Sequence, residues 1–146
     1  MIDKVNQALN QAKDEFSRLL KVRSLDELKF SEENIKSCGI DKFDQSVTKG
    51  IKADLIIFPY LEDMSEGTIA AAGACIIQTS DLRPILGILE INKSNSNIQN
   101  SDNFVTYLKT ILFHEITHVL VFSPDLIEWF TGEEIKTVKG RNGITY

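Results

Sequence analysis

Apolar residues recur at every third or fourth position along the start of the chain. Between Ile2 and Val22 this spacing places one apolar stripe on a helix, formed by Val5, Leu9, Ala12, Phe16, Leu19 and Leu20. The pattern predicts a first amphipathic helix over residues 2–22. From Arg23 to Gly50 the apolar positions are irregular and acidic residues cluster, which predicts loops with short elements.

Three short apolar segments in the middle of the chain are typical of β-strands. Residues 54–58 form an apolar run closed by a proline, which indicates a strand buried on both faces and placed inside a sheet. Residues 69–79 are rich in alanine and fit a helix or a strand, and we predict a strand that starts near Gly73. Residues 85–91 follow Arg83 and a proline, and a proline at a strand's start favours an edge position.

A polar segment divides these strands from a second helical pattern. Residues 92–103 contain five asparagines and no apolar periodicity, which predicts a loop. An apolar stripe from Phe104 to Phe122 then predicts a helix that Pro124 stops, followed by a short element at residues 126–130. The N-cap of this helix is expected among the three residues before it, Ser101, Asp102 or Asn103.

Length and charge narrow the class of protein. The 146 residues suit one domain with a single hydrophobic core, and 42% apolar and 25% charged residues are typical of a globular protein. A net charge of −5, with scattered basic residues, argues against nucleic acid as a partner. The chain has no apolar run of about 18 residues and no signal-peptide pattern, so we expect no transmembrane or targeting segment in it.

The two cysteines, Cys38 and Cys75, are too few for a disulfide scaffold. Their spacing is not that of a zinc knuckle. One disulfide and two buried thiols are both compatible with these residues.

The residues that carry chemistry lie within the second predicted helix. His114-Glu115-Ile116-Thr117-His118 places both imidazoles on one helical face, a single turn apart, and these are the chain's two histidines. Two imidazoles at this spacing can bind one zinc ion, and the carboxylate of Glu115 can reach a water beside it. We predict His114 and His118 as metal ligands and Glu115 as the general base and acid of peptide hydrolysis.

Other residues are less specific. The alternative to a zinc site is a chance motif whose imidazoles are satisfied by hydrogen bonds. A catalytic zinc ion needs a third protein ligand. Glu128, Glu133 or Glu134 could complete a compact site, although surface solvation explains all three residues better. A transition-state donor could come from a tyrosine, but the sequence selects none of Tyr60, Tyr107 and Tyr146.

Three segments carry a resemblance to a known family. They are an aspartate-led apolar strand at residues 53–58, an alanine-rich cysteine segment at 71–75 with an Arg-Pro-x-x-Gly strand at 83–88, and the histidine helix with its Phe-Ser ending at 114–123. Together they resemble the leishmanolysin family of zinc metallopeptidases, within the metzincin group. The likeness covers about residues 53–124.

This resemblance implies an α+β, zincin-like fold, with a twisted mixed sheet, an N-terminal helix and an active-site helix. It implies that Arg83 to Ile91 is the edge strand that lines the cleft and pairs with an extended peptide substrate. Cys75 matches a cysteine that the family usually bridges, and Cys38 is the partner that this chain offers. The family often works at the cell surface or outside the cell, which gives the implied location.

The sequence also departs from the family pattern. Metzincins have glycine three residues after the second histidine, where this chain has Val121, and no third histidine or methionine-containing turn follows before Tyr146. We therefore expect residues 1–146 to be the N-terminal part of one catalytic domain, or a degenerate copy. The predicted function is that of a zinc-dependent metalloendopeptidase, and the alternative is an inactive, peptide-binding or adhesion module.

Overall fold

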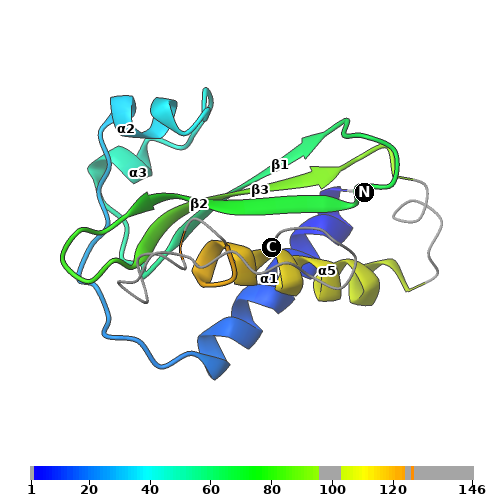
Figure 1. Cartoon of the computed structure of the whole chain (residues 1–146), viewed down its shortest axis with the longest axis horizontal. Helices are drawn as coiled ribbons and strands as arrows, with labels where there is room; N and C mark the ends of the chain where they lie inside the picture. The colour runs from blue at the N-terminus through cyan, green and yellow to red at the C-terminus, as the bar shows by residue number, and fades with distance from the viewer. Residues whose placement is uncertain (1, 96–102, 124–125, 127–146) are drawn as a thin grey trace, which may run out of the picture.

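Helices cover both faces of a mixed sheet in the computed structural model, which describes residues 2–95, 103–123 and 126. The longer helices α1 (Ile2–Leu19) and α5 (Phe104–Leu120) lie on one face, and the short helices α2 (Glu32–Ser37) and α3 (Ser46–Lys49) lie on the other (Figure 1). The predicted α+β fold is confirmed. Within the described residues, no helix is long and apolar enough to cross a membrane.

The sheet of the described residues has the strand order β1-β3-β2. Its strands are β1 (Ile56–Glu62), β2 (Ala70–Ile77) and β3 (Pro84–Asn92). β1 runs parallel to β3, and β2 runs antiparallel to it. The alanine-rich segment is thus a strand, as predicted, and it begins three residues before Gly73.

The predicted positions of two strands in the sheet were wrong. The strand expected inside the sheet, β1, lies at an edge and contains Pro59, whose missing N–H an edge strand tolerates. The strand expected at an edge, β3, is the central one. Pro84 is the first residue of β3, where a missing N–H removes little from the ladder even in a central strand.

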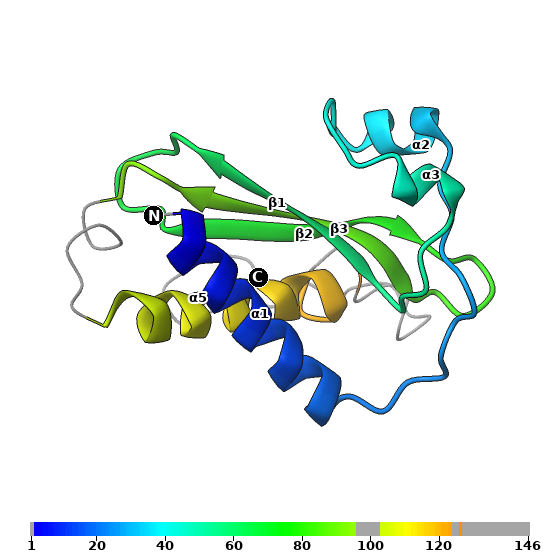
Figure 2. The same cartoon turned by 180° about the vertical axis from the view of Figure 1, so that it is seen from behind.

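The first hydrophobic core lies between the sheet and the helices α1 and α5, which cross over each other (Figure 2). The rings of Phe16 and Phe113 stack with their centroids 4.2 Å apart, and Lys109 forms an ion pair of 2.9 Å with Glu15. α1 ends at Leu19, before the predicted Val22. The side chain of Val22 is 49% exposed, so a further helical turn would bury little apolar surface.

The second core lies on the other face of the sheet, beneath α2 and α3. A disulfide joins Cys38, at the end of α2, to Cys75 of β2, so the pairing implied by the family resemblance is confirmed. The pairing register of β2 shifts between Ala74 and Ile76, which makes Cys75 the extra residue of a β-bulge. The bulge therefore lies where β2 is tied to the α2 layer.

The predicted second helix is α5, which begins after Asn103 and ends at Leu120. Asn103 occupies the N-cap position without a capping hydrogen bond from its side chain. The loop predicted at residues 92–103 lies partly outside the described residues. Of the short element expected at residues 126–130, the structure describes Leu126, which is buried.

Candidate active site

Helix α5 presents two kinds of surface. One face is buried, with Phe104, Leu108, Leu112 and Ile116 in the first core and Val119 beyond them. This anchoring leaves His114 exposed, and Glu115 and His118 half-buried. Because residues 114 and 118 are four positions apart on a helix, their side chains lie one above the other. The buried face of α5 thus fixes the direction in which both imidazoles point.

The imidazole rings of His114 and His118 approach each other through their Nε2 atoms. The Nε2 atoms of His114 and His118 lie 3.2 Å apart, and the ring planes are nearly perpendicular, at 83°. The Nδ1 atom of His118 lies 2.5 Å from the backbone carbonyl oxygen of Phe122. A carbonyl can only accept, so Nδ1 carries the proton and donates it. In the neutral ring, Nε2 then keeps the lone pair, which faces His114 and is the pair that would bind a metal.

The separation of these nitrogens can be compared with that in a tetrahedral metal site. Two imidazole nitrogens bound to one zinc ion at about 2.0–2.1 Å, with a tetrahedral angle between them, lie about 3.3–3.4 Å apart. The measured Nε2 to Nε2 distance of 3.2 Å is close to this value. The separation of the two Nε2 atoms is therefore compatible with two ligands of one zinc ion.

A third ligand is not among the residues that the structure describes. Within residues 2–95, 103–123 and 126, no three His, Cys, Asp or Glu side chains form a group that could hold a metal. The three candidate ligands from the sequence, Glu128, Glu133 and Glu134, lie outside these ranges. The compact site that they would complete stays a prediction.

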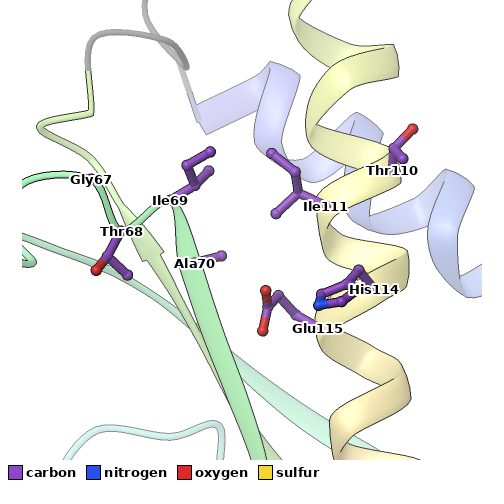
Figure 3. A pocket seen from close by; sticks show the side chains of 8 residues that line it. All are labelled: Gly67, Thr68, Ile69, Ala70, Thr110, Ile111, His114 and Glu115. Carbon is purple, nitrogen blue, oxygen red and sulfur yellow. The ribbon is translucent and has the colours of Figure 1, made fainter. Parts of the chain in front are cut away.

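An open groove of about 410 Å³ lies between α5 and the beginning of β2. Figure 3 shows His114 and Glu115 directed from α5 toward this groove, with Ala70 of β2 across from them. The groove is lined by Gly67, Thr68, Ile69 and Ala70 on the strand side and by Thr110, Ile111, His114 and Glu115 on the helix side. Glu115 thus shares an accessible, largely apolar groove with one of the two histidines.

The strand side of the groove could not be identified from the sequence. Gly67 to Ala70 carry no ionisable side chain, so nothing in their chemistry singles them out. A signal is present in Ala70, Ala72 and Ala74, which are every second residue of β2, because small residues on one face of a strand leave space beside a neighbouring helix. These small residues indicate a groove only once the tertiary structure shows that α5 lies beside β2.

The expectation that residues 83–91 form the edge strand of the cleft was wrong. These residues belong mainly to β3, whose backbone pairs with β1 on one side and with β2 on the other, so it has no free edge for a peptide. Arg83, just before β3, binds Asp54 at 2.9 Å and the backbone carbonyl of Arg23 at 2.6 Å. The edge strand that borders the groove is β2.

Neither of the candidate tyrosines that the structure describes lines the groove. Tyr60 is on β1, and its buried hydroxyl has no hydrogen-bond partner among the described residues. Burial is the largest cause that raises the pKa of this phenol. Tyr107 is on the first turn of α5, about two turns before His114, and Tyr146 lies outside the described residues. The described structure therefore gives neither Tyr60 nor Tyr107 a position from which to act on a substrate in the groove.

Val121, which replaces the glycine of the family pattern, ends α5 in a different way. It is the C-cap residue with a φ of −149°, and its N–H donates to the carbonyl oxygen of Thr117. This φ is accessible to valine, whereas a glycine-specific turn would need a positive φ. The chain then brings the carbonyl of Phe122 back to His118.

Comparisons with known proteins agree with this architecture. The sequence model of the leishmanolysin family matches residues 3–145, which is nearly the whole chain. A search of curated proteins gave no significant match. The helices and mixed sheet are consistent with the metzincin-like fold of that family. The chain therefore belongs to the leishmanolysin family of metallopeptidases.

Proposed function

We propose that this chain is part of a zinc-dependent endopeptidase in which His114 and His118 hold the metal and Glu115 is the catalytic carboxylate. One observation carries the proposal: the two imidazole Nε2 atoms converge at 3.2 Å on the helix that also directs Glu115 into an open groove. A chance pair of surface histidines would not need to share a metal-compatible separation and a neighbouring carboxylate in a groove.

The reaction assigned to this site is hydrolysis of a peptide bond. When bound, zinc supplies a Lewis acid that polarises the scissile carbonyl and lowers the pKa of a water molecule. Glu115 removes a proton from that water as the water oxygen bonds to the carbonyl carbon. The same carboxyl group then gives the proton to the leaving nitrogen as the carbon–nitrogen bond breaks. The products are a carboxylic acid and an amine, and Glu115 returns to its starting state.

The substrate in this proposal is an extended peptide that pairs with the outer edge of β2. The N–H of Asn92 donates to the carbonyl of Ile69 at 2.9 Å, so residues 69 and 92 form a hydrogen-bonded pair of the antiparallel ladder. The next pair, Ala70 with Ile91, is therefore of the non-hydrogen-bonded kind, and Ala72 with Leu89 repeats it. The N–H and C=O groups of Ala70 and Ala72 point away from β3, toward the side on which a peptide could add as a strand.

We place the third ligand beyond α5. The residues open to this role are Glu128, Glu133 and Glu134, or a residue of a longer chain if residues 1–146 are the N-terminal part of the catalytic domain. The imidazole of His118 is held by the backbone carbonyl of Phe122. Phe122 comes six residues before Glu128, the first of the three candidate ligands in the sequence. The two histidines would in this way be prepared for a ligand brought in by the segment that follows them.

The test is the variant Glu115→Gln, with zinc content measured by elemental analysis and cleavage measured on a mixture of unstructured peptides. Glutamine keeps the size of the side chain but cannot accept the proton, so cleavage should fall by about 10²–10⁴-fold. Zinc content should equal that of the unaltered chain, near one per chain. Glu33→Gln, on the exposed first turn of α2, is the matched control and should leave both quantities unchanged.

His118→Ala separates metal binding from catalysis. Loss of one imidazole should remove zinc as well as cleavage. Equal loss of zinc in Glu115→Gln and His118→Ala would refute the separate role of Glu115. A folded chain that takes up no zinc but binds peptides without cutting them would instead support the alternative function, an inactive peptide-binding or adhesion module.

A further inference from the structure

Asn92 connects the central strand to the segment that forms the strand side of the groove. It is the last residue of β3, and only 2% of its surface is exposed. Its side-chain Nδ2 donates to the carbonyl oxygen of Thr68 at 2.8 Å. Its Oδ1 accepts from the N–H of Met64 at 3.3 Å and from the N–H of Ser94 at 3.1 Å. One buried amide thus serves backbone groups of the turn before β2 and of the turn after β3.

We propose that Asn92 is a positioning residue for substrate binding, which sets the place of the groove's strand side relative to Glu115. This inference rests on the proposed peptidase function. The residues that Asn92 holds lead directly into the groove, because Thr68 and Ile69 are among the groove-lining residues. Both are fixed by Asn92, Thr68 through the side chain and Ile69 through the backbone N–H.

The chemistry of the amide is specific to this position. Asparagine offers a donor and an acceptor at the end of one short side chain, and here the donor and the acceptor are both used. An aspartate would keep the acceptor for Met64 and Ser94 but would place a second oxygen against the carbonyl oxygen of Thr68. At 2% exposure, water has little access to separate the two oxygens. The Nδ2 of Asn95 also donates to the carbonyl oxygen of Thr68, at 3.1 Å, but this bond does not remove the repulsion between the oxygens. The segment from Met64 to Thr68 would have to move instead.

The helix side of the groove does not depend on Asn92. The two histidines and Glu115 lie on α5, which is held by the first core and by contacts with α1 such as the Phe113–Phe16 stack. A displacement of Thr68 and Ile69 therefore changes one side of the groove and leaves the metal ligands in place. In an active enzyme, such a displacement would change KM but not kcat, because peptide binding is weakened while the chemical step on bound peptide is kept.

The experiment compares Asn92→Asp and Asn92→Ala with Asn10→Asp in the full, zinc-loaded chain. Asn10 is exposed on α1, so its variant makes the same change of amide to carboxylate away from the groove. We expect KM for a peptide substrate to rise about tenfold in both Asn92 variants, as for the loss of a buried hydrogen bond. The value of kcat should stay within about twofold, and zinc content and all constants of Asn10→Asp should match those of the unaltered chain.

Hydrogen exchange provides a readout that does not need activity. Faster exchange in the Asn92 variants should be confined to residues 63–70 and 92–95, with none in α5. An unchanged KM in folded Asn92→Asp would overturn the inference, and so would zinc loss, exchange that spreads into α5, or failure of both variants to fold. If the unaltered chain binds zinc but cuts no peptide, the proposed peptidase function is refuted. The exchange pattern then still tests whether Asn92 positions the strand side of the groove.

Discussion

Gly87 of β3 lies directly against Val119 of α5, with no room for a side chain between them. A Cβ atom placed on Gly87 would be 2.5 Å from one methyl carbon of Val119 and 3.2 Å from the other. Val119 is fully buried, and its β-branched side chain has little freedom to turn aside. It also follows His118 directly in the sequence, so this contact sets how close the candidate ligand helix lies to the central strand.

The variant Gly87→Ala should push α5 away from the sheet. Overpacking at such a site costs about 1–3 kcal/mol of unfolding free energy. Because both imidazoles move together with α5, zinc content should be kept, whereas peptide cleavage should fall as the groove between α5 and β2 changes its width. Urea unfolding, elemental analysis and a cleavage assay on the same preparation measure the three quantities.

Gly73→Ala is the matched control, since a Cβ at Gly73 on β2 would meet nothing within 4 Å. It should be neutral, or stabilising by a few tenths of a kcal/mol through the unfolded chain. In the Val119→Ala background the cost of Gly87→Ala should shrink, because the clashing methyl groups are gone. An unchanged cost in that background would show that Val119 is not the residue that excludes a side chain at position 87.

The disulfide between Cys38 and Cys75 should stabilise the whole fold. The two cysteines are separated by 37 residues, and closing a loop of this length removes about 3–4 kcal/mol of unfolded-state entropy. Cys75→Ser should therefore lower the urea midpoint strongly, and a reducing agent should lower that of the unaltered chain by the same amount. If reductant lowers the midpoint of Cys75→Ser as well, its effect does not come from this bond.

Stability should fall in acid partly through Asp54. Its carboxylate accepts a hydrogen bond from the N–H of Leu25 at 2.8 Å and another from Arg83 at 2.9 Å, and these contacts, the one from Leu25 most, hold its pKa below the usual 3.8. A lowered carboxyl pKa gives stability that is complete above 3.8 and is lost as the pH falls through the lower, folded value. Asp54→Asn should be less stable than the unaltered chain at neutral pH.

The difference between these two proteins should shrink below pH 3.8 and disappear once the pH has fallen through the lower, folded pKa of Asp54, where both lack the charge. Urea unfolding at a series of pH values from neutral to strongly acidic measures this difference in unfolding free energy. The control is Asp81→Asn, in the exposed turn before Arg83. Parallel stability curves for the unaltered chain and Asp54→Asn across this range would exclude the assigned role of Asp54.

The spacing of residues along the chain was enough to predict the features that arise from residues close together in the sequence. The helix that carries His114, Glu115 and His118 was predicted from apolar periodicity, and the convergence of its imidazoles follows from a separation of four residues on a helix. The α+β class and the presence of three strands were also predictable. The choice between a disulfide and two thiols was not, because it depends on two cysteines that are distant in the sequence.

Tertiary structure decided the order of the strands and therefore the second side of the groove. The sequence placed residues 54–58 inside the sheet and 85–91 at its edge, and the structure has the opposite arrangement. Strand order arises from pairing between distant segments, which a proline or a short apolar run does not reveal. The same holds for Gly87 under Val119 and for Asn92 beside Thr68: each role comes from a partner more than twenty residues away, brought near only by the packed fold.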